Sequence, residues 1–547
     1  MELSEIDGSS YRSLICGGVA ALERDRVRIN DLNVFPIPDG DTGDNMYMTI
    51  RAGAAAADGD SLAAVAASVA QGALLGARGN SGVILSRILA GVAAGFADAE
   101  RADAATVAGA LEEGVRQAYG AVAKPVEGTV LTVYREATEA AAAALRAGKT
   151  PQEGLAIMRE AAARSLEHTP EQLAVLREAG VVDSGGAGLV SILDGMLGAL
   201  DGDTAAVLPA ADTLAGNENV DLSLFTEDSV LEYGYCTEFL LRLQRCKGDP
   251  AAFDEAAFTA HLNEIGDSVV AFRDGTVVKV HVHTRYPAEI LAYAQKFGEF
   301  LTLKIENMTL QHNGVRENAA SRPAKPHKRY AVVAVAAGQG IRETFLSMGA
   351  DAVVDGGQSM NPATEDFIRA FESVNADTVF VFPGNGNILL TAEQAGKLYT
   401  DATVRVIPCR SIGETYAALS VLDLSSGDTE QIVAGATAAI GEAVSGGVSQ
   451  ANRDTEMNGI RVQNGDYIGF SDGTVLSDGA TAGDALLGLA AALDAGRYGI
   501  LLLICGQAVT AEAAQEAYRR LSETYRRTEV IMLDGGQPIH DYILMLE

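Results

Sequence analysis

Apolar residues recur at helical spacing through the first 200 positions of the chain. In the first such stretch, Ile6, Leu14, Ile15, Val19 and Leu22 line one face of a predicted helix. Further helical stretches, separated by short turns with Gly, Pro or Asp, lie near 45–57, 61–77, 81–97, 104–120, 128–147, 151–167, 170–179 and 184–200. The pattern predicts an all-helical bundle.

The periodicity changes after residue 230. Alternating apolar residues predict strands at 231–243, 268–272, 277–284 and 301–310, and helical spacing predicts helices at 254–265 and 287–297. The order β-α-β-β-α-β is typical of a ferredoxin-like α+β sandwich.

From residue 330 onward strands and helices alternate, which favours an α/β domain. Its candidate strands are 331–336, 352–354, 378–381, 403–407, 499–504 and 529–532. Two polar stretches, 201–230 and 316–329, have the composition of linkers. We therefore expect three domains, at 1–205, 206–315 and 330–547, in a chain of 547 residues that is too long for one hydrophobic core.

The formal net charge of −32 narrows the possible partners. Such a surface repels nucleic acid, anionic membranes and also ATP, so a nucleotide site here needs bound cations. The five scattered cysteines imply no disulfide framework and fit a reducing compartment. The acidic N-terminus is unlike a signal peptide, and no apolar run is long enough to span a bilayer. We expect a cytoplasmic protein.

The most informative segment is NVFPIPDGDTGDNM, at residues 33–46. Its prolines stiffen the chain and its glycines allow close backbone approach. Asp39 and Asp41 project two carboxylates into one small volume, and hard oxygen ligands at that spacing suit Mg²⁺. The helix N-terminus that follows offers free N–H groups to a phosphate. On this segment alone, a capped turn or an incomplete calcium loop explains the pattern equally well.

Three later turns share this combination of small residues and hydroxyls before a helix. They are ARGNSG at 77–82, EGT at 127–129 and VDSGGAG at 182–188. In an up-and-down helical barrel, the loops after alternate helices lie at the same end. We therefore expect four loops to gather around one triphosphate.

Four segments resemble, in order and spacing, the dihydroxyacetone-kinase-like (DhaL) domain of the catalytic component of fatty acid kinase. They are NVFPIPDGDTGDNM, GARGNSGVILS, EGTVLTV and VVDSGGAG. That family has an eight-helix barrel with ATP and two Mg²⁺ ions at one end. The resemblance implies Asp39 and Asp41 as Mg²⁺ ligands and as the catalytic residues. It also implies nucleotide contacts along the four loops, at Asn33, Thr42, Gly43, Asn45, Met46, Asn80, Ser81, Gly82, Gly128, Thr129 and Asp183. Dihydroxyacetone kinases have a third metal carboxylate near the place of Asn33, at a different spacing.

A possible metal site lies in the middle domain. His281 and His283 are two residues apart in a predicted strand, so both imidazoles face one side of it. With Cys236 from another strand they would suit Zn²⁺, although strand histidines at this spacing are more often plain surface residues. The resemblance continues through YGYCTEF, VKVHVHT and IENMTLQH, and it implies zinc binding by Cys236, His281 and His283.

Gly and Asn gather at three predicted strand ends of the last domain, at 356–362, 383–387 and 535–538. Binding loops of α/β folds lie at such ends, although ordinary turns have the same composition. The three segments resemble the DegV-like C-terminal domain of the same family, with more Gly and less Asn at 383–387 than the family pattern.

The resemblance covers essentially the whole chain and implies a function. The family transfers the γ-phosphate of ATP to a fatty acid carboxylate and so makes an acyl phosphate for phospholipid synthesis. A separate fatty-acid-binding protein presents the lipid, and a homodimer is expected. One alternative is a kinase for a small polyol such as dihydroxyacetone, which the two extra domains argue against. Another is a lipid-binding regulatory protein with a degenerate nucleotide site, which the intact DGDTG loop argues against.

Overall fold

A computed structural model describes residues 4–33, 40–122, 124–200, 235–247, 249, 253–274, 276–307, 327–357 and 361–547. The chain divides into two compact units. One unit comprises Met1–Asp212 together with His327–Glu547, and the other comprises Thr213–Pro326. The first unit therefore holds the helical domain and the C-terminal domain, and the second holds the middle domain.

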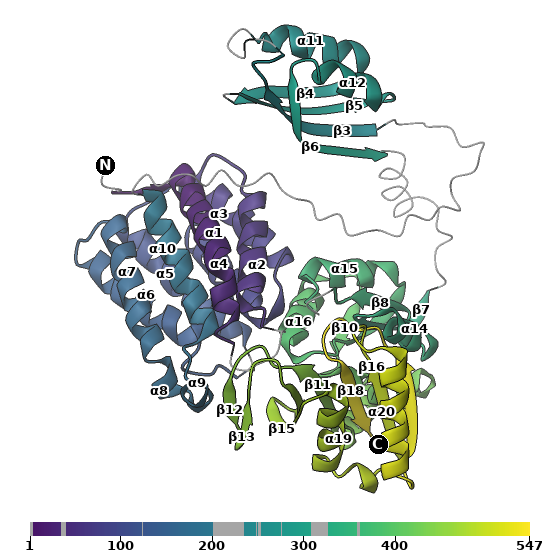
Figure 1. Ribbon diagram of the computed structural model, residues 1–547. Helices are drawn as coiled ribbons and strands as arrows, with labels where there is room; N and C mark the ends of the chain where they lie inside the picture. The colour runs from purple at the N-terminus through teal and green to yellow at the C-terminus, as the bar shows by residue number, and fades with distance from the viewer. Residues whose placement is uncertain are drawn as a thin grey trace. The chain divides into compact units, whose positions relative to one another are not determined.

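The first domain is helical, as the spacing of apolar residues predicts (Figure 1). Its helices are α1 (Gly8–Asn30), α2 (Thr42–Ala56), α3 (Leu62–Leu75), α4 (Gly79–Gly95), α5 (Ala104–Ala121), α6 (Val130–Arg146), α7 (Pro151–Glu167), α8 (Thr169–Gln172), α9 (Ala174–Ala179) and α10 (Ser184–Leu200). The predicted helix at 170–179 is instead the two short helices α8 and α9, because Leu173 between them has an extended backbone, with φ −124° and ψ 111°. A two-residue ladder joins β1 (Ile6–Asp7) to β2 (Arg101–Ala102).

Small residues let the first and last long helices of this domain approach closely. A Cβ added to Gly17 on α1 would collide with the carbonyl oxygen of Gly195 on α10. Large apolar side chains fill the interior, and Leu22 and Ile50 are fully buried there. The packing of α1 on α10 closes the helices around one core.

The middle domain has the predicted order of elements. They are β3 (Tyr235–Leu243), α11 (Glu255–Ile265), β4 (Asp267–Asp274), β5 (Val277–Thr284), α12 (Pro287–Ala294) and β6 (Gly298–Asn307). The sheet is antiparallel with the strand order β4-β5-β3-β6. Phe239 and Val280 of the sheet share one core with Phe258 and Leu262 of α11. The ferredoxin-like prediction is confirmed.

The described part of the C-terminal domain contains two larger sheets and a two-stranded hairpin. The first is a parallel sheet in the order β10-β9-β7-β8. Its elements are β7 (Lys328–Ala336), α14 (Gln339–Ser347), β8 (Ala352–Asp355), α15 (Thr364–Ser373), β9 (Ala376–Phe382), α16 (Leu389–Leu398), β10 (Thr403–Val406), α17 (Ile412–Ser420) and α18 (Thr429–Glu442). This α/β part is the one that the sequence predicts.

The second sheet is mixed, in the order β15-β14-β11-β18-β16-β17. Its elements and the adjoining hairpin are β11 (Val444–Gln450), β12 (Thr455–Met457), β13 (Ile460–Val462), β14 (Tyr467–Ser471), β15 (Thr474–Gly479), α19 (Ala482–Ala492), β16 (Ile500–Cys505), α20 (Ala511–Thr524), β17 (Glu529–Asp534) and β18 (Tyr542–Leu546). Only β16 and β17 correspond to predicted strands. The sequence of β11, VSGGVSQ, lacks the usual strand signature because the ring of Phe470 lies 2.7 Å from where a Cβ on Gly447 would be.

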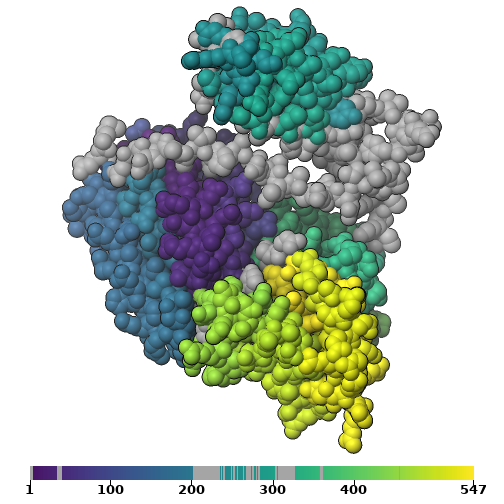
Figure 2. Space-filling model, viewed as in Figure 1, coloured from purple at the N-terminus to yellow at the C-terminus, as the bar shows by residue number. Residues whose placement is uncertain are grey.

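The helical and C-terminal domains touch within their shared unit (Figure 2). The backbone N–H of Thr364, at the start of α15, donates to the carbonyl of Ala77 at 3.1 Å. The side chain of Gln394 on α16 donates to the carbonyl of Leu74 at 2.9 Å. The second of the four loops, which follows α3, is therefore part of this contact.

Candidate functional site

The four small-residue loops lie at one end of the helical domain. Helices that start at the opposite end, α1, α3, α5 and α7, are each capped by the side chain of their N-cap residue. Helices α2, α4 and α6, which start at the loops, have no such cap. Other side chains nevertheless accept from these helix starts: Asn30 Oδ1 accepts from the N–H groups of Gly43 and Asp44 on α2, and Asn387 Oδ1 accepts from the N–H of Asn80 on α4. The loops therefore bring together helix N-termini that lack a cap from their own N-cap residue, and helix N-termini are common phosphate-binding sites.

The first and second loops are in direct contact. Gly79 has a φ of 55°, and a Cβ at this position would collide with the Asn45 amide at the start of α2. A Cβ on Gly82 would collide with the Thr49 hydroxyl. The glycines thus bring the backbone of the second loop close to α2.

The fourth loop joins the first through hydroxyl groups. The Ser184 hydroxyl donates to Asn33 Oδ1 and to Thr42 Oγ1, both at 3.1 Å, and the Thr42 hydroxyl donates to Asn33 Oδ1 at 2.9 Å. Next to it, Gly185 packs against Val130, at the end of the third loop: a Cβ added to Gly185 would lie 3.1 Å from Val130 Cβ. The expected gathering of the four loops is confirmed by these contacts.

Asp41 is the most deeply placed charged group of the site. It is 8% exposed, and burial raises the pKa of its carboxyl to about 6. Amide hydrogen bonds from Asn45, Asn361 and Asn387 act in the opposite direction. Its predicted partner Asp39 lies outside the described residues, as do residues 34–38. Among the described residues this carboxylate accepts hydrogen bonds from neutral amides, and Mg²⁺ would supply the opposite charge that a buried carboxylate requires.

Asn80 contributes a second sign that a ligand belongs here. Its side-chain Oδ1 is buried and has no hydrogen-bond partner among the described residues. Its backbone N–H donates to Asn387 Oδ1 at 3.3 Å. Buried amide oxygens are rarely left unpaired. With the helix N-termini and Asp41, this oxygen fits a site for magnesium and a nucleotide.

The remaining predicted nucleotide contacts have varied surroundings. The Gly43 N–H donates to Asn30 Oδ1 at 2.7 Å, and the Thr129 hydroxyl donates to the Val126 carbonyl at 2.8 Å. Gly128 has a φ of 82°. Ser81 is half-buried on the first turn of α4. Met46 is 1% exposed in the hydrophobic core, so its role is packing against the interior of the barrel.

Asp183 gives the apo protein a pH-dependent stability. Burial raises the pKa of its carboxyl to about 6, and the Gly186 N–H, which donates to Asp183 Oδ2 at 2.7 Å, opposes this shift. The charged form therefore destabilises the fold, and the penalty is absent below pH 4 and grows as the pH rises through 6. Asp183→Asn keeps the acceptor for Gly186. It should stabilise the ligand-free chain on the order of 2 kcal/mol at pH 7.5 and by little at pH 4. Denaturant titrations at both pH values check this, and a variant that is less stable than wild type at pH 7.5 contradicts it.

A cavity of about 760 Å³ opens beside Asp41. Its wall includes Asn387, Arg410 and Ser411 at the carboxyl ends of the parallel strands, and His540 before β18. This is where α/β folds place ligand sites. The predicted Gly- and Asn-containing segments do follow strands β8, β9 and β17, although residues 358–360 lie outside the described residues.

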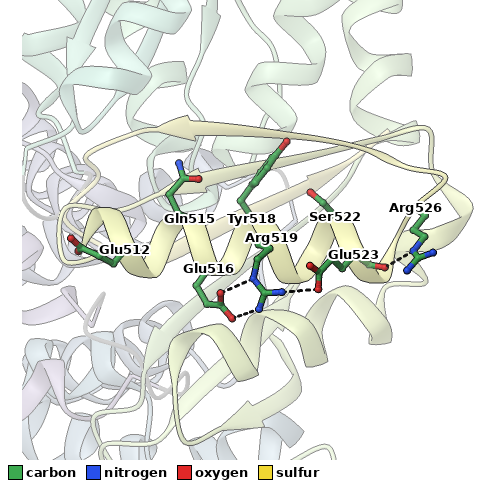
Figure 3. A pocket seen from close by; sticks show the side chains of 8 residues that line it. All are labelled: Glu512, Gln515, Glu516, Tyr518, Arg519, Ser522, Glu523 and Arg526. Atoms are coloured by element: carbon green, nitrogen blue, oxygen red, sulfur yellow. Dashed lines mark hydrogen bonds and ion pairs between the residues drawn. The ribbon is translucent and has the colours of Figure 1, made fainter.

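Another hollow, of about 620 Å³, lies on the exposed face of α20 (Figure 3). Arg519 pairs there with Glu516 and Glu523 along the helix. Exposed ion pairs of this kind stabilise a helix slightly, and the lining side chains come from α20 and the turn after it, so groups from different elements do not converge on a ligand here. This hollow carries no site.

The predicted zinc ligands cannot be placed beyond the backbone. The register of the sheet pairs Cys236 on β3 with His283 on β5, and Glu238 with His281. The side chains of Cys236, His281 and His283 lie outside the described residues. Among the side chains that the structure does describe, no group of three metal-binding residues occurs. Zinc binding stays a prediction.

Comparison with known proteins decides the family. The sequence model of the DAK2 domain matches residues 36–198, and those of the FakA-like middle and C-terminal domains of fatty acid kinase match 232–315 and 331–547. The chain is 37% identical over 560 residues to Protein YloV of Bacillus subtilis, with 100% of both chains covered. It belongs to the FakA-like fatty acid kinase family. An uncharacterized protein of Staphylococcus aureus is 35% identical over 557 residues, again with 100% of both chains covered.

A solved structure from the DegV family is also similar to this FakA-like chain. The DegV family protein of Thermus thermophilus, described for its fatty acid binding, matches 40% of this chain and 99% of its own, at 13% identity and a TM-score of 0.31. Within the described part of the chain, no helix is long and apolar enough to cross a membrane.

Sequence reasoning missed three groups at the site. Asn361 and Asn387 bind Asp41 although they lie more than 300 residues later in the chain. Arg453, in the turn before β12, donates to the carbonyls of Asp31 and Asn33. The two asparagines fall within the segments that the Gly and Asn composition singles out, but nothing in that composition connects them with Asp41.

Proposed function

We propose that this FakA-like protein is an ATP-dependent kinase that transfers the γ-phosphate to a fatty acid carboxylate. The acyl phosphate product then serves phospholipid synthesis. The observation that supports the proposal is the meeting of four loops and the helix N-termini that follow them at one end of the helical domain, where Asp41 is buried and Asn80 Oδ1 has no hydrogen-bond partner among the described residues. Membership of the FakA-like fatty acid kinase family also supports a kinase.

In the proposed mechanism the chain binds and orients ATP, and the carboxylate of the fatty acid is the nucleophile that attacks the γ-phosphate. Asp39 and Asp41 hold Mg²⁺, which neutralises charge on the triphosphate when bound. The hydroxyls of Thr42, Ser81 and Thr129 and the positive ends of the helix dipoles direct the phosphates. Because the protein carries a net charge of −32, ATP binding depends on these metal carboxylates.

A separate carrier protein is proposed to present the lipid. The apolar cavity inside the helical domain, of about 110 Å³, is lined by core residues such as Leu14, Ile88 and Leu193 and by no residue of the four loops. The larger cavity beside Asp41 is lined by charged and amide groups as well as apolar ones. A long acyl chain needs continuous apolar surface, so only its carboxylate is expected to reach the site. A cytoplasmic homodimer is the matching expectation for the kinase itself.

The test of this function is phosphotransfer from labelled ATP with three acceptors. Carrier-bound fatty acid should give acyl phosphate, which hydroxylamine traps as a hydroxamate. Dihydroxyacetone should give no product, and its phosphorylation would favour the polyol kinase. ATP binding without transfer to any acceptor would favour the regulatory protein.

Zinc is proposed for the middle domain, with Cys236, His281 and His283 as ligands. Purified protein should carry close to one Zn²⁺ per chain, because a thiolate and two imidazoles bind this ion strongly. His281→Ala and His283→Ala should each lower the zinc content, and His261→Ala, on α11 of the same domain, should leave it unchanged. Elemental analysis that finds no zinc in wild-type protein never exposed to chelator contradicts the site.

A further inference from the structure

Two asparagines of the C-terminal domain bind the carboxylate of Asp41. Asn361 precedes α15, and Asn387 lies in the turn between β9 and α16. Asn361 Nδ2 donates to Asp41 Oδ2, and Asn387 Nδ2 donates to Asp41 Oδ1 and Oδ2 at 3.2 and 3.3 Å. We propose that Asn361 and Asn387 are positioning residues that orient Asp41 for Mg²⁺, so that the C-terminal domain completes the nucleotide site of the helical domain. This inference rests on the proposed role of Asp41 as a metal ligand.

The hydrogen bonds fix which end of each amide faces the carboxylate. Asn387 Oδ1 accepts from the backbone N–H of Asn80 at 3.3 Å, so its Nδ2 must point away from Asn80. That Nδ2 also donates to Asn361 Oδ1 at 3.3 Å. A reversed amide would place an oxygen against another acceptor. Both asparagines therefore present N–H groups to Asp41 and none of their oxygens.

The same residues tie the second loop to the first. Arg78 Nη1, in the second loop, donates to the backbone carbonyl of Asn361 at 2.9 Å. The Thr364 N–H donates to the carbonyl of Ala77. One short segment of the C-terminal domain thus contacts the metal carboxylate and the proposed phosphate loop together, which sets the distance between them.

A second contact supports the other end of the metal loop. Arg453 Nη1 donates to the carbonyl of Asp31 at 2.8 Å, and Arg453 Nη2 donates to the carbonyl of Asn33. These carbonyls precede residues 34–39, and Asp41 follows them. The C-terminal domain therefore holds the chain on both sides of the loop that carries the two aspartates.

The chemistry favours a role in which Asn361 and Asn387 orient the Asp41 carboxylate for the metal ion and do not block it. A carboxylate has about four lone-pair positions, so amide donors and a metal ion can share it. Groups that hydrogen-bond a ligating carboxylate usually raise metal affinity, and their removal costs about 10- to 100-fold. Asn361 is 1% exposed and Asp41 is 8% exposed, so water does not replace a lost amide easily.

The experiment measures metal-dependent nucleotide binding by the full-length chain. Mn²⁺ is titrated against protein and ADP, and bound Mn²⁺ is followed by electron paramagnetic resonance. Asn361→Ala and Asn387→Ala should each weaken Mn²⁺ binding about 10- to 100-fold. The far-UV circular dichroism of both variants in EDTA should match that of wild type, because neither asparagine lies in a helix of the helical domain. A general loosening of the fold would change this spectrum as well as weaken Mn²⁺ binding.

Gln394→Ala is the matched control. Gln394 donates to the Leu74 carbonyl across the same domain contact but does not touch Asp41, so its Mn²⁺ affinity should stay within about twofold of wild type. Wild-type Mn²⁺ affinity in Asn387→Ala overturns the inference. Tighter Mn²⁺ binding by Asn387→Ala also overturns it, since the amides would then compete with the metal. An equal loss of Mn²⁺ affinity in Gln394→Ala overturns it too. If Asn361→Ala does not fold, Asn387→Ala alone decides. A wild-type chain that binds no Mn²⁺–ADP overturns the proposed function, and this inference with it.

Discussion

Replacing Asp41 with asparagine should abolish ATP turnover, with a loss of at least about 10²–10³-fold. The amide keeps the size of the side chain and its single oxygen can still accept from Asn361, although its NH₂ group then faces Asn387. The hydrogen bonds of Thr364 to Ala77 and of Gln394 to Leu74 should still hold the domain contact. The amide has no charge, however, and the triphosphate then meets a protein of net charge −32 without its bridging cation. The measurement is steady-state turnover of labelled ATP with carrier-bound fatty acid.

Asp60→Asn serves as the control for Asp41→Asn. Asp60 is an exposed aspartate of the helical domain that precedes α3, at the opposite end from the four loops, and its replacement should leave turnover unchanged. Asp39→Asn should behave like Asp41→Asn. Near-normal turnover in both loop variants would move the catalytic site to another part of the chain.

The second large effect concerns the lipid carrier. The protein alone should bind Mg-ATP and yet form acyl phosphate from free fatty acid at a rate roughly 10²-fold or more below that with carrier-bound acid. Burial of an acyl chain contributes roughly 0.8 kcal/mol per methylene, and the apolar cavity of the helical domain is lined by no residue of the four loops, so it does not provide that burial at the nucleotide site. The carrier would supply that burial and place the carboxylate at the γ-phosphate.

The comparison uses one fatty acid at equal concentration, free in one reaction and carrier-bound in the other. Carrier protein without lipid is the control, and it should support no transfer. Equal rates with free and carrier-bound acid would show that the chain binds the lipid itself, and the carrier would then have no role in catalysis.

Helical spacing was enough to predict most of the helical domain and the end at which its loops meet. Short connections force neighbouring helices to run antiparallel, so the loops before α2, α4, α6 and α10 fall at one end. The ferredoxin-like order could likewise be predicted, because each strand and helix is long and regular. Residues 170–179 differ, because one extended residue at Leu173 breaks a helix that the apolar pattern favours.

What the sequence did not reveal depends on contacts between distant residues. Strand β11 has the composition of a turn, because the ring of Phe470 leaves no room for a side chain at Gly447, and strand propensity does not predict such a contact. The hydrogen bonds between Asp41 and Asn361 connect residues 320 positions apart, and no local pattern encodes such a pair. The burial of Asp41 follows from that contact, so the raised pKa of its carboxyl could not be predicted from the sequence either.

Formation of acyl phosphate from labelled ATP and carrier-bound fatty acid, trapped as the hydroxamate, is the direct test of the proposed kinase activity. Wild-type protein with Mg²⁺ should give labelled product in proportion to the ATP consumed, and Asp41→Asn should give none. Unchanged product formation by Asp41→Asn would contradict the proposed role of Asp41. No product from wild-type protein that binds both Mg-ATP and the carrier would contradict the proposed kinase activity.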